Sequence, residues 1–169
     1  MSQDEPTDEP NSSTPDAVAK NGNEGTIIQP SVPRWYWAIG IIALIWNLMG
    51  CDVLLMELFY QEEMMVDFTE AQKEWSRSFG AWVYVLWGIS VFSGIAGSIN
   101  LLRRKKVARV FLDLSFASIF IQMGYTMVIA GGLKVMGPTG AIMPLIIVFI
   151  AVVLLWFVRY AERREWLRA

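Results

Sequence analysis

The stretch Ile142–Val158 reads IMPLIIVFIAVVLLWFV and carries no charged residue. Apolar runs in the buried helices of soluble proteins seldom exceed about 14 residues, whereas a helix that crosses the roughly 30 Å hydrocarbon core of a bilayer needs about 20. Together with its apolar neighbours, this stretch reaches that length. It therefore predicts a transmembrane helix over residues 138–160 and an integral membrane protein.

The rest of the chain follows the same pattern. The 169-residue sequence is 54% hydrophobic and only 18% charged, against about 25% charged residues in a typical soluble domain. Its charged residues gather between long apolar runs, and the runs at 35–59, 79–102 and 107–130 are also long enough to span a bilayer. We therefore expect an all-α, integral membrane four-helix bundle over residues 34–160.

Both ends of the chain differ from this bundle. Residues 1–33 are rich in Asp, Glu, Pro, Ser, Thr and Asn, and a segment with so few apolar side chains buries too little surface to offset the entropy lost on ordering. They predict a disordered acidic tail. Because a signal peptide starts with basic residues and an apolar run, we expect none here. Residues 161–169 predict a short basic C-terminus.

The basic residues predict how the chain is threaded through a membrane. The sequence RRKK, Arg103–Lys106, links the second and third spans, and residues 159–168 add four arginines on the same side of a four-span topology. The opposite side holds only Lys73, Arg77 and Lys134. Because Lys and Arg are enriched in cytoplasmic loops, we expect both termini to be cytoplasmic.

The loop between the first two spans, residues 61–78, predicts structure of its own. Its apolar residues recur every three to four positions, which is the period of one helix face. Thr69 and Gln72 have the spacing of a capping box, which would start a helix just before Glu70. We expect a short helix on the extracytoplasmic interface, with a receptor surface as the alternative.

The first span carries polar residues that lipid disfavours. With a helical rise of about 1.5 Å per residue counted from Trp35, Asn47 lies roughly 18 Å deep, Asp52 about 25 Å and Glu57 about 33 Å. Glu57 therefore falls at the outer boundary, and Asp52 falls in the outer third, where water or tilt could hydrate it. Asn47 is central and needs a partner inside the bundle.

The third span offers that partner. Gln122 lies roughly 22 Å from the inner face, close to the depth of Asn47, and amide hydrogen bonds between membrane helices contribute on the order of 0.6–2 kcal/mol. Ser115, Ser118, Gln122 and Tyr125 form a polar stripe that must face protein or water. Asn47, Asp52, Gln122 and Tyr125 are the candidate intramembrane polar site.

Two further patterns predict packing rather than chemistry. Arg109 and Asp113 are four residues apart near the inner face, which favours a structural ion pair, with a proton-carrying Asp113 as the alternative. In the second span, small residues recur every four positions and favour close approach of helix backbones. These small residues are Ser90, Gly94 and Ser98, with Ser93 and Gly97 beside them.

The composition argues against several function classes. The chain has no histidine and a single cysteine, Cys51, so the commonest general base and the commonest metal ligand are both missing. We find no nucleophile beside a base and no cofactor motif, and a net charge of −2 does not favour nucleic acid. We expect no enzyme activity, no cofactor, no metal and no nucleic-acid partner.

Three segments resemble a family of small four-span bacterial inner-membrane proteins, some of which are labelled sugar transporters. They are PRWYWAIGIIALIWNLMGCDV (33–53), GIAGSINLLRRKKVARVFLDLSF (94–116) and RREWL (163–167). The resemblance implies a bacterial inner-membrane location and the four-span topology. The family's motifs have no assigned roles, so no functional residue follows from it.

Two functions fit these observations. The first is transport of a small, sugar-like solute, with Asn47 and Gln122 at similar depth as its motivation. The second is an accessory or structural role, in which the bundle binds a membrane-protein partner or a second copy and the acidic tail binds a soluble protein. For both functions, we expect the four spans to contact the lipid bilayer as a partner.

Overall fold

The structure is a computed structural model, and it describes residues 31–168. Most of the predicted acidic tail, residues 1–33, therefore lies outside the described residues. The described part is helical, and four of its helical segments are long and apolar enough to cross a membrane, which confirms the predicted all-α class and the four long apolar helices. The elements in chain order are α1 (Arg34–Phe59), α2 (Gln61–Met64), α3 (Glu70–Arg77), α4 (Ala81–Leu102), α5 (Ala108–Gly124), the π-helix η1 (Tyr125–Ile129), α6 (Gly132–Val135), α7 (Gly137–Gly140) and α8 (Ile142–Arg163).

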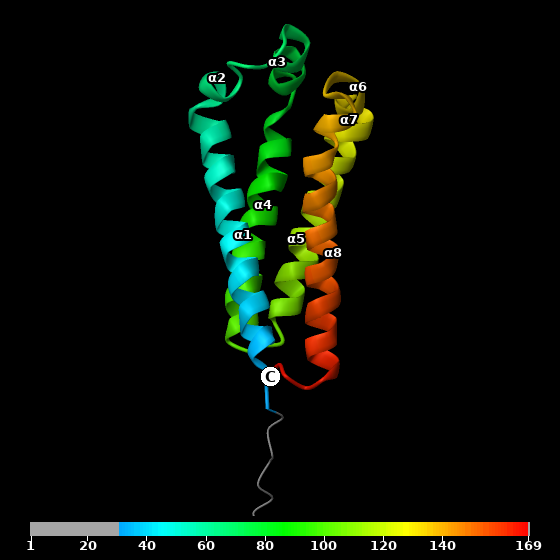
Figure 1. Ribbon diagram of the computed structural model, residues 1–169. Coiled ribbons are helices and arrows are strands. Elements are labelled where there is room, and N and C mark those ends of the chain that lie inside the picture. Colours follow the sequence, from blue (N-terminus) through cyan, green and yellow to red (C-terminus); the bar gives the residue numbers. More distant parts are fainter. Residues whose placement is uncertain (1–30, 169) are drawn as a thin grey trace, which may run out of the picture.

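The long helices pack in chain order. The helix α4 lies between α1 and α5, and α8 packs on α5. Figure 1 shows that α1 and α8 come together at the end where α1 begins and α8 ends, and that they diverge toward the end that carries α2, α3, α6 and α7. We call the second of these ends the loop end. The helices α1 and α8 are therefore not a closely packed pair.

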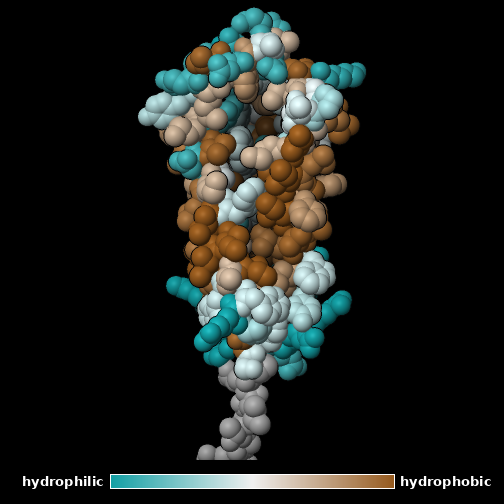
Figure 2. All heavy atoms as spheres, viewed as in Figure 1, coloured by the Kyte–Doolittle hydropathy of each residue, from teal (hydrophilic) through white to brown (hydrophobic). Residues whose placement is uncertain are grey.

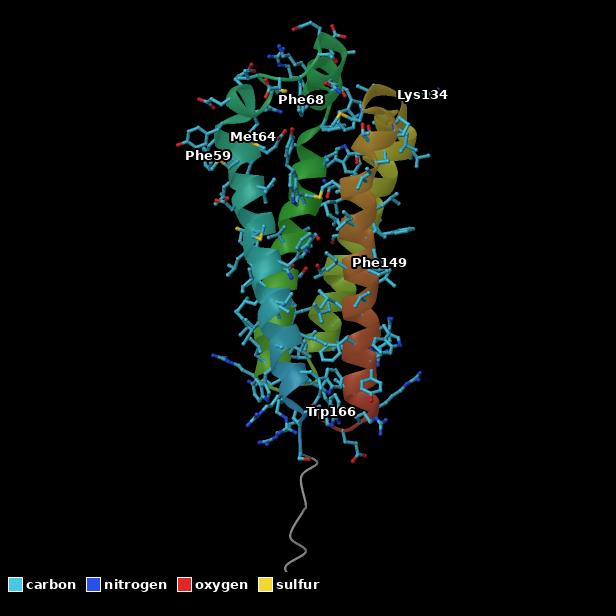
Figure 3. All side chains as sticks on the ribbon, viewed as in Figure 1. Phe59, Met64, Phe68, Lys134, Phe149 and Trp166 are labelled. Carbon is cyan, nitrogen blue, oxygen red and sulfur yellow. The ribbon has the colours of Figure 1, made fainter. Side chains whose placement is uncertain are left out.

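We call the other end the basic end, because ten of the thirteen Lys and Arg residues in the described range lie there. They are Arg34, Arg103, Arg104, Lys105, Lys106, Arg109, Arg159, Arg163, Arg164 and Arg168. Polar side chains gather at both ends of the molecule, and a wide apolar belt lies between them (Figure 2). Phe149, which points outward from α8 in Figure 3, belongs to this belt. Such a belt is the surface that a hydrocarbon layer would cover.

The span boundaries fall within a few residues of those predicted, and the differences have local causes. The third span ends in the π-helix η1, and Gly131 follows it in the left-handed region at φ 76°. The fourth span continues to Arg163 rather than Tyr160. Beyond it, Trp166 and Leu167 are buried, so the C-terminal residues belong to the packed part of the protein.

The loop end contains the predicted short helix. Thr69 Oγ1 accepts from Gln72 N at 3.4 Å, and Gln72 Oε1 accepts from Thr69 N at 2.9 Å, which is the predicted capping box. The helix α3 does not run directly into α4, because residues 78–80 separate them. A bidentate pair between Arg77 and Glu62 connects α3 to α2.

An aromatic cluster joins α1, α8 and the C-terminal residues at the basic end. The Trp35 ring lies 5.7 Å from that of Phe157 and 5.4 Å from that of Trp166, measured between centroids. Trp166 lies at the base of the bundle (Figure 3), and its carbonyl accepts from Arg104 Nε at 2.7 Å. Tyr36 is fully buried and donates its hydroxyl to the Leu101 carbonyl. These contacts hold α1 and α8 together at this end.

Candidate functional site

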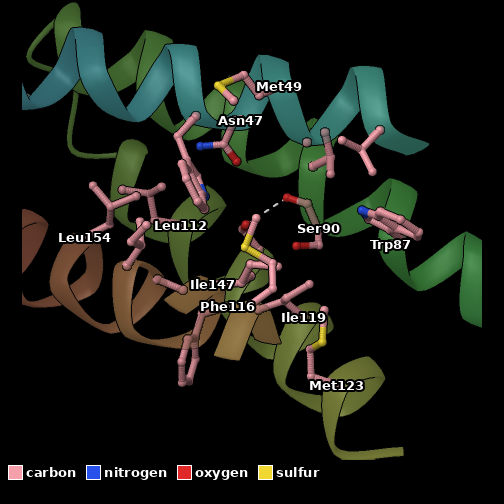
Figure 4. A pocket seen from close by; sticks show the side chains of 18 residues that line it. Asn47, Met49, Trp87, Ser90, Leu112, Phe116, Ile119, Met123, Ile147 and Leu154 are labelled. Carbon is pink, nitrogen blue, oxygen red and sulfur yellow. Dashed lines mark hydrogen bonds between the residues drawn. The ribbon is translucent and has the colours of Figure 1, made fainter. Parts of the chain in front are cut away.

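A cavity of about 230 Å³ lies near the middle of the bundle, between the diverging helices α1 and α8. Residues of α4 and α5 form its floor, and residues of α1 and α8 form its two sides. Figure 4 shows Asn47 and Met49 reaching it from α1, and Ile147 and Leu154 from α8. Figure 2 shows the molecule hollowed on this side. The cavity follows directly from the divergence of α1 and α8 (Figure 1).

The polar lining of the cavity is small. Asn47 Nδ2 donates one of its two N–H groups to the Ala43 carbonyl one turn earlier at 2.8 Å, so the amide keeps a second N–H and the Oδ1 acceptor. Ser115 Oγ donates to the Ser90 carbonyl at 2.7 Å, linking α5 to α4 on the cavity floor (Figure 4). Asn47, Ser90 and Ser115 are the polar residues of the lining, and Trp46 and Trp87 add indole N–H groups.

A glycine on α4 makes room for this arrangement. A Cβ at Gly94 would overlap Asn47 Oδ1 and would lie 3.1 Å from Ser115 Oγ. The absence of a side chain at Gly94 therefore lets the Asn47 amide lie against α4 between two helices. The predicted small residues of α4, which are Ser90, Ser93, Gly94, Gly97 and Ser98, are all buried.

The rest of the lining is apolar, aromatic and rich in methionine. The aromatic members are Trp46, Trp87 and Phe116, and the methionines are Met49, Met123 and Met143. Methionine side chains are flexible and polarisable, so they adapt to ligands of different shape and contact aromatic rings favourably. The sequence analysis did not single out these methionines. Spacing alone does not separate a cavity-lining face from a lipid-facing one.

The structure does not gather the four residues of the predicted polar site. Asn47 lines the cavity, whereas Gln122 is buried outside its lining. The expected hydrogen bond between these two amides is wrong, because Asn47 donates to Ala43 and Gln122 Oε1 has no hydrogen-bond partner in the described part of the chain. Similar depth on two helices did not bring the side chains together, since the rotation of each helix about its own axis decides which way each one points.

The other two residues of the predicted site lie elsewhere. Tyr125, at the start of η1, packs edge-on against Trp82 with 4.5 Å between the ring centroids. Asp52 is exposed on α1 and lines no part of the cavity.

Glu57, which the sequence placed at the outer boundary of the first span, lies one and a half turns beyond Asp52. Its carboxylate accepts from Gln61 Nε2 at 3.2 Å and from Ser76 Oγ at 3.3 Å. It therefore ties α1 to the loop-end helices.

The predicted pair of Arg109 and Asp113 forms part of a larger network. Arg109 Nε lies 3.6 Å from Asp113 Oδ2. Asp113 Oδ1 accepts from Arg159 at 2.9 Å, and Arg109 Nη1 donates to Glu162 at 2.8 Å. Both of these further contacts cross from α5 to α8. The network is partly exposed, so each pair contributes only about 0.2–1 kcal/mol, and it helps fix α8 on α5.

Comparisons of the chain with known protein families, with curated proteins and with solved structures find no match. The family resemblance drawn from the sequence therefore stays a prediction. Within residues 31–168, no group of three or more His, Cys, Asp or Glu side chains is placed to hold a metal ion. The cavity is accordingly the feature on which a functional proposal rests.

Proposed function

We propose that the chain is a multi-pass membrane protein that binds a small solute in the cavity between α1 and α8 and carries it across the membrane. The observation that supports this is the position of the cavity. It lies at mid-length of four helices that are each long enough to span a bilayer. A site at that depth is where a membrane transporter holds its solute between the two sides.

The aromatic cluster at the basic end is a second observation that supports this proposal. It joins α1 to α8 at the basic end, and the cavity lies between the same two helices nearer their middle. A carrier needs a site that is accessible from one side at a time. In this proposal, the aromatic cluster shuts the cavity toward the basic end.

Asn47 is the residue on which solute binding is expected to depend. Asn47→Leu keeps a similar volume and removes the only side-chain amide of the lining. A lost hydrogen bond costs about 1 kcal/mol, and 1.4 kcal/mol corresponds to a tenfold change in affinity. We expect uptake into proteoliposomes, at solute concentrations below saturation, to fall about five- to tenfold.

Asn100→Leu is the matched control for this measurement. Asn100 Nδ2 donates to the Ala96 carbonyl one turn earlier at 2.8 Å, as Asn47 does to Ala43, but Asn100 lies outside the cavity. Its replacement should leave uptake within twofold of wild type. The panel of solutes should include sugars, polyols and small aromatic compounds. Wild-type vesicles that take up none of them faster than empty vesicles would contradict transport and favour the accessory role.

A further inference from the structure

The lining of the cavity restricts the chemical class of the solute. Charged side chains are absent from it, and the polar groups of its eighteen lining residues are one amide, two serine hydroxyls and the indole N–H groups of two tryptophans. A sugar carries a hydroxyl on nearly every carbon, and each hydroxyl left without a partner in an apolar site costs roughly 1–3 kcal/mol. An ion would bind in this cavity even less favourably than a sugar, because the lining holds no side chain of opposite charge.

We infer that the solute is a neutral, compact, mostly apolar molecule with a single polar group, and that it reaches the cavity sideways from the lipid through the gap between α1 and α8. This inference rests on the proposed function and deepens it, because it replaces the sugar-like solute that the sequence suggested.

The size of the cavity sets the size of the molecule. An apolar cavity of about 150 Å³ holds one benzene ring, so a cavity of about 230 Å³ has room for a fused pair of rings, or about ten non-hydrogen atoms. The rings of Trp46, Trp87 and Phe116 supply faces and edges against which a flat molecule can pack.

Asn47 sets the polar requirement. One N–H of its Nδ2 is engaged by the Ala43 carbonyl, so the second N–H and the Oδ1 acceptor of the amide remain for a ligand. The Ser115 hydroxyl likewise donates within the protein, to the Ser90 carbonyl. A solute with one polar group, such as an N–H or O–H, can therefore pair with the Asn47 amide, whereas a solute without a polar group makes no hydrogen bond there.

The sideways route follows from the packing of the helices. At the level of the cavity, α1 and α8 are separate sides of the site, with Val53 on one and Met143 on the other. The two helices are not a closely packed pair, and apolar side chains next in sequence to lining residues, such as Leu48 and Ile146, are exposed. A molecule dissolved in hydrocarbon meets this opening directly, whereas the aromatic cluster blocks the basic end.

Fluorine NMR of the full-length protein in lipid nanodiscs tests the inference with three probes. The probes are 5-fluoroindole, which has one donor; 2-fluoronaphthalene, which has none; and 2-deoxy-2-fluoroglucose, which is rich in hydroxyls. We expect saturable binding of fluoroindole, about five- to tenfold weaker binding of it to Asn47→Leu, and no effect of that variant on fluoronaphthalene. We expect no binding of fluoroglucose.

Two variants show where the probe binds. Ala151→Phe fills the cavity from α8 and should weaken fluoroindole binding at least tenfold, whereas Ala117→Phe places the same ring on the exposed face of α5 and should not. Gly50→Val fills the cavity from α1, where an added Cβ meets only ordinary contacts. It takes the place of Ala151→Phe in this test if that variant fails to fold. Equal effects of Ala151→Phe and Ala117→Phe would place the probe in bulk lipid and overturn the inference.

The pattern of failure separates this inference from the proposed function. Saturable binding and uptake of fluoroglucose, without binding of fluoroindole, would overturn the solute class and leave transport standing. Binding of fluoroindole without faster uptake than in empty vesicles would uphold the solute class and contradict transport. Failure of every probe to bind or enter would overturn both.

Discussion

Single residues on α4 decide how closely its neighbours approach. A Cβ at Gly97 would lie 2.8 Å from two side-chain carbons of Leu112 and 3.3 Å from the Leu112 backbone nitrogen. Because the backbone of α5 cannot give way as a side-chain tip can, Gly97 fixes the distance between α4 and α5. Gly94 has a different role, since it accommodates the Asn47 amide at the cavity.

Gly97→Ala should therefore destabilise the bundle. Overpacking typically costs 1–3 kcal/mol, and the better helix propensity of alanine returns at most about 1 kcal/mol. We expect a net loss of about 1–2 kcal/mol in the free energy of unfolding, measured by titration with denaturing detergent in mixed micelles.

Gly88→Ala is the control on the same helix. A Cβ there meets Leu54 at 3.9 Å and Phe92 at 4.0 Å, which are ordinary contacts, so this variant should be unchanged or more stable by up to about 1 kcal/mol. Equal stability of the two variants would show that Gly97 does not set the spacing of α4 and α5.

At the scale of elements, α3 depends on its own sequence more than on the bundle. It is eight residues long and starts with a complete capping box, whereas α1, α4, α5 and α8 start without a side-chain cap. Long apolar helices are held by the low-polarity surroundings, in which every backbone group must be paired internally. A short helix at the loop end has no such constraint, and its first turn needs the cap.

Thr69→Ala should loosen α3 without affecting the long helices. Loss of an N-cap costs about 1 kcal/mol, so the amide hydrogens of α3 should exchange roughly fivefold faster, as measured by mass spectrometry in micelles. Thr139→Ala removes an exposed threonine of α7 for which the described residues show no side-chain hydrogen bond, and it should leave α3 exchange unchanged. Unaltered exchange in Thr69→Ala would mean that packing on α6, rather than the cap, holds α3.

The whole molecule separates charge along its length. The basic end holds most of the described Lys and Arg residues, whereas the loop end carries Glu62, Glu63, Asp67, Glu70 and Glu74. The two ends flank the apolar belt (Figure 2). In a membrane, the excess of basic residues would direct the basic end toward the cytoplasm.

Reporter fusions test this orientation. A phosphatase that is active only outside the cytoplasm should be inactive when fused after Ala169 and active when inserted at Glu70, and a fluorescent protein that folds only in the cytoplasm should give the opposite pattern. Matching signals from the two positions would contradict the four-span topology. Reversed signals would contradict only the orientation.

The sequence alone determined the features that depend on local chemistry. Charge-free runs such as Ile142–Val158 predicted four long helices, and Thr69 with Gln72 predicted the start of α3. The small residues around Gly94 predicted the buried face of α4. Each of these follows from neighbouring residues, because helix length, capping and periodicity are set within a few turns.

Only the tertiary structure decided how these helices face one another. It directed Asn47 to the Ala43 carbonyl and a cavity rather than to Gln122, left Asp52 exposed, and buried Trp166 against Trp35. The physical reason is that the rotation and tilt of each helix arise from all its contacts together. Residues at equal depth can therefore point to different neighbours, and a cavity exists only where two packed helices diverge.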